Sequence, residues 1–169
     1  MRSLRAVAIV VVVAVLIVVG IIQYRIIVQP PNSPAGMLTI YYAKPDGETL
    51  GNWPVTLGPA RDPHSVAFYA AVQAVAGPPS STDAVRFPAG TIVRTVAIDG
   101  KTATVDLAGA VTSNGGGTFA ESGEFKALVW TLTDVAGISA VRITIDGARV
   151  ATLPGGHLEL DEPLSRSSW

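Results

Sequence analysis

The chain has 169 residues, a formal net charge of −1 and no cysteine. This length suits one domain of ordinary size together with a membrane anchor, and the lack of cysteine excludes a disulfide framework and lipid attachment to a cysteine. From Gly36 onward there are nine Lys and Arg and 13 Asp and Glu residues, a net charge of −4 without a basic cluster, which argues against nucleic acid as the partner.

The first predicted element is an apolar run from Ala6 to Ile22 that contains no polar side chain. A helix rising ~1.5 Å per residue spans ~26 Å over such a run, close to the ~30 Å hydrocarbon core of a bilayer. The run is longer than the apolar core of a typical signal peptide, and no small-x-small cleavage site follows closely. We therefore expect an uncleaved transmembrane helix within residues 1–28. Arg2 and Arg5 before the run predict a cytoplasmic N-terminal end and an extracytoplasmic remainder.

Residues 29–36, with the sequence QPPNSPAG, predict a stiff and extended proline-rich linker. The following residues, 37–162, are expected to form one extracytoplasmic domain. It opens with a strand over Met37–Ala43, which is rich in β-branched and aromatic residues and ends at the turn sequence KPDGE. A second short strand around Trp53–Leu57 is a weaker prediction, since Pro54 cannot donate a hydrogen bond to a neighbouring strand.

A helix with clear start and stop signals follows. Asp62 supplies an N-cap carboxylate, Pro63 suits the first helical position, and Gly77 followed by two prolines ends the helix. The apolar stripe that we expect to face the core consists of Phe68, Val72, Val75 and Ala76.

The sequence TIVRTVAIDGKTATVDL predicts a β-hairpin with a tight turn at Asp99–Gly100. Ile92, Val96 and Ile98 share one parity in the first strand and are expected to lie on one face of it. Asp106 has the parity opposite to the apolar residues of the return strand. It could be a binding carboxylate, although a solvated or turn-capping role is favoured.

A second helix follows the glycine-rich loop TSNGGGTF, and Thr118 with Glu121 matches a capping box. Gly137 is expected to end this helix. Its apolar stripe consists of Phe125, Leu128 or Val129, Leu132 and Val135. Residues 141–145 then alternate as a strand, and Asp146–Gly147 predicts a turn into a last strand at 150–153.

The order of elements is therefore β(β)αββαββ. It predicts an α+β fold in which two helices pack on one face of a mostly antiparallel sheet, preceded by the single transmembrane helix. Residues 163–169, including Trp169, are expected to form a flexible tail.

No catalytic site emerges from the polar residues. Asp62, His64 and Ser65 lie within the first turn of one helix, where Asp and Ser are ordinary capping residues, and no Gly-x-Ser-x-Gly elbow occurs. The sequence NGGGT precedes a helix as phosphate-binding loops do, but it lacks the Gly-Lys-Ser/Thr ending of a P-loop. We therefore expect no catalytic residue and no cofactor.

His157, Glu159 and Asp161 are weak candidates for a metal site. Their spacing at i, i+2 and i+4 would place the three side chains on one face of a strand. Three ligands on one strand seldom converge without a further ligand from elsewhere. An edge strand with its polar face in water, and Leu158 and Leu160 pointing inward, is therefore the favoured interpretation.

Four residues are candidates for an interaction surface: Tyr42, Trp53, Trp130 and Asp134. Trp130 lies off the apolar stripe of its helix, so it could cover a sheet edge or anchor a partner, with boundary packing as the ordinary alternative. Asp134 is poorly placed near the negative end of the helix dipole. It is expected to be ion-paired, solvated or in contact with a partner.

Four collinear segments resemble the GerMN domain family. LTIYYA is similar to its opening strand and AAVQAVAGPP to its helix ending in Gly-Pro; FPAGTIVRTVAIDGKTATVDLAG is similar to its hairpin, and LVWTLTDVAGISAVRITIDG to its second helix and closing strand. Together they cover most of Leu38–Leu160. The family is known from sporulation and spore-germination proteins and from cell-envelope lipoproteins. Many relatives are lipoproteins and some carry two copies of the domain, whereas this chain has no cysteine and one copy.

The resemblance implies a non-enzymatic extracytoplasmic module, folded like the ring-building domains of secretion-type assemblies and acting through protein contacts. With the anchor, it predicts a membrane-anchored interaction or assembly module of the cell envelope, with an envelope protein or a second copy as partner. The alternative is binding of cell-wall glycan or peptide, with Tyr41, Tyr42 and Trp53 as stacking surfaces. A metal-dependent hydrolase that uses the His157 set ranks third.

Overall fold

The computed structural model describes residues 36–58, 62–113 and 117–169. The predicted transmembrane helix in residues 1–28 and nearly all of the predicted linker lie outside these ranges. Within them, no helix combines the length and the apolar character that a membrane crossing requires.

The first two strands form a separate hairpin. β1 (Met37–Ala43) pairs antiparallel with β2 (Leu50–Thr56) in a two-stranded sheet. In the turn between them, Asp46 Oδ1 accepts hydrogen bonds from the backbone N–H groups of Glu48 (3.0 Å) and Thr49 (2.9 Å). Pro54 pairs with Thr39 inside β2, which is tolerated because proline is compatible with an edge strand.

The second sheet has three strands in the order β3-β4-β5. β3 (Thr91–Asp99) and β4 (Thr102–Gly109) form the predicted hairpin, while β5 (Ala140–Ile145) runs parallel to β4. The expected antiparallel pairing holds for β1–β2 and β3–β4, and the exception is the parallel β4–β5 pair. Its cause is the long connection between β4 and β5, because a crossover that contains a helix returns the chain to the end where β4 started.

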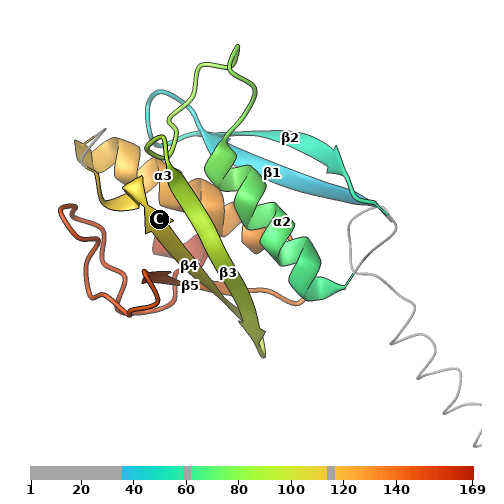
Figure 1. The fold of residues 1–169 in the computed structure, drawn as a ribbon. Helices are drawn as coiled ribbons and strands as arrows, with labels where there is room; N and C mark the ends of the chain where they lie inside the picture. The colour runs from blue at the N-terminus through green and yellow to red at the C-terminus, as the bar shows by residue number, and fades with distance from the viewer. Residues whose placement is uncertain (1–35, 59–61, 114–116) are drawn as a thin grey trace, which may run out of the picture. The chain divides into compact units, whose positions relative to one another are not determined.

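That connection holds the short helix η1 (Ala110–Thr112) and helix α3 (Gly117–Leu132), while helix α2 (Pro63–Ala76) connects the two sheets. α2 packs against β3, α3 and β1, and α3 packs against α2 and β1. Figure 1 shows both helices between the β1–β2 hairpin and the three-stranded sheet. The sequence predicted that both helices cover one face of a single sheet. This prediction is wrong, because the first hairpin forms a sheet of its own.

The buried face of α2 shares only Val75 with the predicted one. Its ends are as expected, with Asp62 as N-cap and Gly77 at φ 76° closing the helix. The core-facing residues, however, are Ala67, Ala70, Ala71, Ala74 and Val75. Phe68 is 40% exposed instead. Small side chains allow α2 to approach α3 and β3 closely, so the alanines take the core positions that hydrophobicity alone assigned to larger residues.

A β-bulge explains a second difference. The register between β3 and β4 shifts between Val93 and Thr95, so the inward parity changes within β3. Val93, Val96 and Ile98 pack against the core, whereas Ile92 is 54% exposed rather than sharing their face.

The tight turns also differ in detail from the prediction. Asp99 pairs with Thr102, so the first turn centres on Gly100 (φ 56°), one residue later than expected. Asp146 (φ 50°) and Gly147 (φ 80°) form the second predicted turn with positive φ at both positions. No strand follows it among the described residues; isolated bridges form instead, Ile145↔Ala148 and Thr152↔Glu159 among them.

Helix α3 ends at Leu132, five residues before the predicted stop at Gly137. Its predicted stripe is buried, including Val135 beyond its end. The chain tightens there, because the N–H groups of Asp134 and Val135 donate to carbonyls three residues back, at 3.3 and 3.1 Å.

Residues 163–169, expected as a flexible tail, pack on the domain. Leu164 bridges to Val141, and a short helix η2 (Arg166–Ser168) follows.

Candidate functional site

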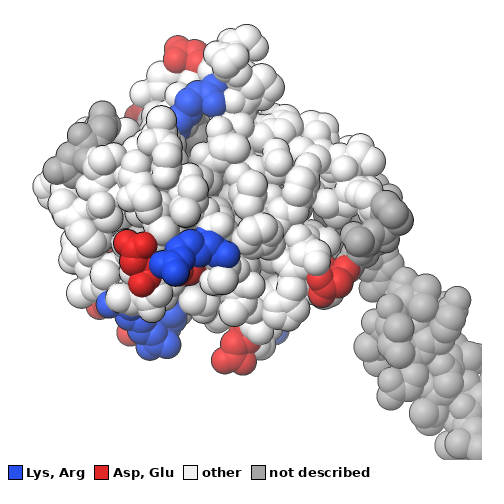
Figure 2. Space-filling view, viewed as in Figure 1, with Lys and Arg blue, Asp and Glu red and all other residues white. Residues whose placement is uncertain are grey.

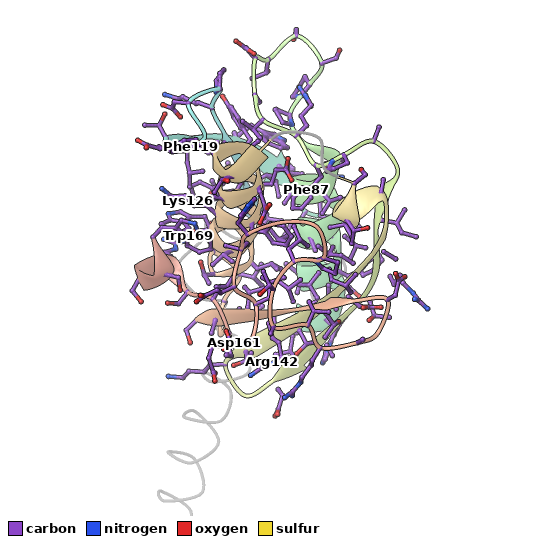
Figure 3. The ribbon with its side chains drawn as sticks, turned by 90° about the vertical axis from the view of Figure 1, so that its left-hand side faces the viewer. Phe87, Phe119, Lys126, Arg142, Asp161 and Trp169 are labelled. Atoms are coloured by element: carbon purple, nitrogen blue, oxygen red, sulfur yellow. The ribbon has the colours of Figure 1, made fainter. Side chains whose placement is uncertain are left out.

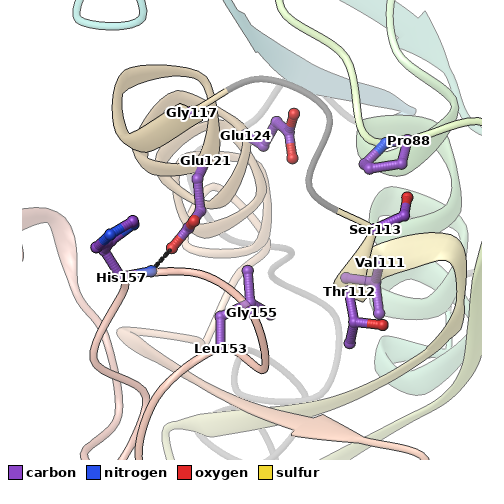
Figure 4. A pocket seen from close by; sticks show the side chains of 10 residues that line it. All are labelled: Pro88, Val111, Thr112, Ser113, Gly117, Glu121, Glu124, Leu153, Gly155 and His157. Atoms are coloured by element: carbon purple, nitrogen blue, oxygen red, sulfur yellow. Dashed lines mark hydrogen bonds between the residues drawn. The ribbon is translucent and has the colours of Figure 1, made fainter.

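A pocket of about 240 Å³ lies beside the N-terminal turns of α3. We call it the Glu124 pocket. Its walls come from three parts of the chain: the approach to β3 and η1, the first turns of α3, and the loop around Gly155 (Figure 4). The lining residues are Pro88, Val111, Thr112, Ser113, Gly117, Glu121, Glu124, Leu153, Gly155 and His157.

Glu121 is fixed in one wall of this pocket. Its Oε1 accepts hydrogen bonds from the backbone N–H groups of His157 (2.8 Å) and Leu158 (2.5 Å). A Cβ added at Gly156 would come within 2.4 Å of the Glu121 carboxylate, so a larger residue there would require this carboxylate to shift. The predicted capping box assigned Glu121 to its own helix terminus. In the structure the carboxylate instead holds a distant loop against α3.

Glu124 lies one turn further along α3 and also lines the pocket (Figure 4). Burial raises the pKa of its carboxyl group from 4.5 to about 8, and the neighbouring Glu121 carboxylate adds to this effect. Glu124 therefore carries a proton at neutral pH, beside the Glu121 carboxylate that two backbone N–H groups hold in place. The pair places a proton donor beside a fixed negative charge.

This arrangement can exchange a proton near neutral pH, but none of the described lining residues is an activated nucleophile. The Ser113 hydroxyl donates to the carbonyl of Ala110 (2.7 Å). His157 Nδ1 lies 3.5 Å from Thr118 Oγ1 in an exposed position. Asn114, Gly115 and Gly116 of the glycine-rich loop, considered for phosphate binding, lie outside the described residues.

The candidate metal ligands do not form a strand. His157 and Asp161 lie in irregular chain, and Glu159 makes only the isolated bridge to Thr152. The Asp161 carboxylate accepts from the N–H of Glu162 (3.0 Å), while its carbonyl accepts from Arg142 (3.1 Å; Figure 3). Within the described ranges, no three His, Cys, Asp or Glu residues come together in a way that could hold a metal ion.

The triad candidates at the start of α2 act as a helix cap. The carboxylate of Asp62 accepts from the backbone N–H groups of His64 (3.3 Å) and Ser65 (2.8 Å). These bonds lower the pKa of Asp62, with the contacts to Ser65 as the largest cause.

Asp106 has the predicted turn-capping role, but it is buried rather than solvated. Its Oδ1 accepts from the Thr144 hydroxyl (2.9 Å) and from the Gly147 N–H (2.7 Å). Arg94 Nε lies 3.6 Å from Oδ2 of Asp106, and Arg94 Nη1 lies 3.5 Å from Asp146. Asp106 therefore connects β3, β4 and the turn after β5 in one polar cluster.

Tyr42 and Trp53, two of the predicted interaction residues, pack on each other across the β1–β2 hairpin. Their ring centroids are 5.9 Å apart, and the Tyr42 ring occupies the space beside Gly51. Trp53 also packs against the core, and both residues are half-buried.

Trp130 and Asp134, the other two, meet at one surface. Asp134 forms an ion pair with Arg166 (3.6 Å), which places it among the outcomes expected from its position near the end of α3. Trp130 contacts Trp169 edge-to-face at 5.6 Å and lies beside Lys126 and Arg166. Figure 3 shows Trp169 and Lys126 on the same side of α3.

Sequence reasoning missed both Glu124 and Arg166. The spacing of Glu121 and Glu124 places them on one side of a helix, which is a detectable signal. Their burial depends on the loop around Gly155, which shows no regular pattern in the sequence. Arg166 gives no signal, because its hydrogen-bond partners lie 33 and 36 residues away.

Comparison with known proteins gives a consistent result. The family model Germane, described as sporulation and spore germination, matches residues 39–151. No curated protein matches the chain.

Three solved structures are similar to this chain. The tandem GerMN domains of the sporulation protein GerM from Bacillus subtilis share 24% identity at a TM-score of 0.63, covering 78% of this chain and 46% of that one. This chain thus spans about half of the tandem protein. The first GerMN domain of the same protein gives 25% identity and a TM-score of 0.60, with 78% and 98% covered. A predicted lipoprotein from Clostridium perfringens, at 16% identity and a TM-score of 0.56 with 83% and 95% covered, shows the same fold.

The family model covers two thirds of the chain, and the structural matches extend over the elements described above. The chain therefore belongs to the Germane family of sporulation and spore-germination domains, and its described residues form a GerMN-type fold.

Proposed function

We propose that this protein is a membrane-anchored, non-catalytic interaction module of the bacterial cell envelope, whose domain lies outside the membrane and contacts another envelope protein. The apolar run from Ala6 to Ile22 supports the anchor, and the two arginines before it support the orientation. Family membership supports a role in the envelope, since its relatives include sporulation proteins.

The observation that carries the proposal is the outer face of α2. This helix has no Lys, Arg, Asp or Glu over its 14 residues. Its inner face is the alanine stripe, and its other positions expose Phe68 and Tyr69, the latter at 37%. A helix that is uncharged on all sides is typical of one that is covered on all sides. Figure 2 shows that the face containing α2 and β3 is mostly uncharged.

A charge placed on this face tests the contact. Tyr69→Asp should abolish crosslinking of the full-length protein to its neighbour in intact cells, measured by mass spectrometry of the crosslinked species. Phe119→Asp is the matched control, because Phe119 is 69% exposed on α3, away from α2. If Tyr69→Asp and wild type give the same crosslinked partner in the same yield, the α2 face is not the contact.

The proposed location has a separate test. Because the chain has no cysteine, one cysteine at exposed Ser81 provides a unique label site. A membrane-impermeant maleimide should label Ser81→Cys in intact cells whose outer layers have been made permeable to it. Labelling only after the cytoplasmic membrane has been broken would contradict the proposed orientation.

A further inference from the structure

Residues Pro163–Trp169, which we call the Arg166 segment, bind the domain through an arginine that is held from several directions. The guanidinium of Arg166 lies over the rings of Tyr41 (5.9 Å) and Trp130 (5.8 Å). Its Nε donates to Thr133 Oγ1 (2.9 Å), and its Nη2 donates to the Trp130 carbonyl (3.2 Å). Asp134 lies 3.6 Å from the same nitrogen. Stacking, directed donors and opposite charge together are how proteins recognise arginine in particular.

Two further contacts flank the arginine. Leu164 and Val141 exchange both backbone hydrogen bonds at 2.8 Å, which adds one rung to the edge of β5. The Trp169 indole N–H donates to Ser122 Oγ (3.0 Å), and its ring meets Trp130 edge-to-face (Figure 3). The segment is thus bound as an extended peptide is bound by a sheet edge, with side-chain anchors on either side.

The residues that receive the segment all belong to the family domain. They are Tyr41, Ser122, Trp130, Thr133, Asp134 and Val141, within the matched range 39–151, whereas the segment itself lies beyond it. The residues that lead into the segment, Asp161 and Glu162, are exposed, and among the described residues the domain holds them by one hydrogen bond, from Arg142 to the Asp161 carbonyl. The binding contacts therefore do not depend on which chain supplies the segment.

We propose that this surface is a docking site for an extended, arginine-bearing peptide segment, and that it takes the Arg166 segment of a second copy of the chain in place of its own. Each copy then supplies one segment and receives one, so the exchange closes as a symmetric dimer. The same contacts form whether the docked segment is the chain's own or that of a second copy, and the local concentration of the second copy decides which of the two docks. In this respect the inference rests on the proposed function, because two copies anchored in one membrane meet at high local concentration.

A shortened connection tests the exchange. Deleting Asp161 to Pro163 from the full-length chain removes about 10 Å of reach, so the segment cannot return to its own domain. In detergent solution this variant should have twice the protein mass of wild type by light scattering. Adding Arg166→Ala to the deletion should return it to a monomer.

The matched control inserts Gly-Ser-Gly after Glu162, which lengthens the connection and should leave the chain monomeric. A folded deletion variant that stays monomeric would overturn the exchange. So would a dimer that persists with Arg166→Ala, because another face would then hold it together.

A peptide assay tests the docking site without depending on that deletion. A labelled peptide of residues 161–169 should bind saturably to the full-length chain that carries Arg166→Ala and Trp169→Ala, measured by fluorescence anisotropy. It should bind wild type at least about tenfold more weakly, because the chain's own segment competes at high effective concentration. A peptide with Arg166→Lys should also lose about tenfold, since lysine cannot stack and donate in the same geometry.

Absence of saturable binding, or equal binding of the arginine and lysine peptides, would overturn the docking site. The assay uses purified components and does not involve the α2 face. Its failure is therefore distinguishable from failure of the proposed envelope contact, which the Tyr69→Asp crosslinking experiment measures.

Discussion

Glu124→Gln should stabilise the domain in a pH-dependent way. The Glu124 carboxyl has a pKa of about 8 in the folded chain and an ordinary value of 4.5. Because the pKa of Glu124 is higher in the folded chain, its protonated carboxyl contributes fully to the free energy of unfolding below pH 4.5. This contribution is lost as the pH rises through about 8. Wild type should therefore lose stability between these two pH values, and a side chain that cannot ionise should not lose this part.

The magnitude follows from the same two values. Between the two pKa values, the unfolded chain loses the Glu124 proton while the folded chain keeps it, so the free energy of unfolding falls by ~1.4 kcal/mol for each pH unit. Over the whole interval, the loss has an upper limit of ~5 kcal/mol, reached above pH 8. Glu124 is partly exposed at an open pocket, so water screens much of this cost. We expect Glu124→Gln to gain about 1–2 kcal/mol at pH 8.5 and close to nothing at pH 4.5.

Urea unfolding followed by tryptophan fluorescence, repeated from pH 4.5 to 9, measures this difference. Subtracting the wild-type curve from the variant curve removes the pH dependence that the two proteins have in common. A difference that does not change with pH, or one that shrinks as pH rises, would refute the assignment of a buried neutral carboxyl.

Substitutions at three other positions test stability and local order. Asp106→Ala should cost about 2 kcal/mol, because it removes the acceptor shared by the buried Thr144 hydroxyl and the Gly147 N–H, whereas Asp106→Asn should cost less than half as much; chemical denaturation compares the two. Gly123→Ala should destabilise by about 1–3 kcal/mol despite its better helix propensity, because the new Cβ would lie 2.8 Å from Ala43 Cβ, and a lowered Tm would show it. Arg166→Ala should increase proteolysis of residues 163–169 while the core stays protected, visible by mass spectrometry of timed digests. An Asp106→Asn cost equal to that of alanine, a neutral Gly123→Ala or unchanged digestion of the Arg166→Ala chain would each contradict the corresponding contact.

The sequence was sufficient where local signals are strong. Asp62 and Pro63 start α2, glycine ends it, and the alternation of apolar residues identified β3, β4 and β5. Sequence reasoning failed where close packing of helices determines which residues are buried. Hydrophobicity assigned Phe68 to the core of α2, but the close approach of α2 to its neighbours selects alanine.

Register and long-range contacts were the other limits. A bulge beside Arg94 changes the parity of β3, and no residue of the strand signals it in advance. The raised pKa of Glu124 and the binding of Arg166 depend on segments that meet only in the folded chain. Sequence reasoning could name Trp130 and Asp134 as surface candidates, but not the arginine that lies between them.

The parallel pairing of β4 with β5 also constrains the order in which the domain folds. The β3–β4 hairpin closes through two turn residues and can form locally, whereas β5 cannot join β4 until the intervening 110–139 region has been brought back across the molecule. Closing that loop costs chain entropy before any rung of the pair forms. Assembly of the three-stranded sheet is therefore coupled to docking of α3, and the edge that receives Leu164 exists only once this slow step is complete.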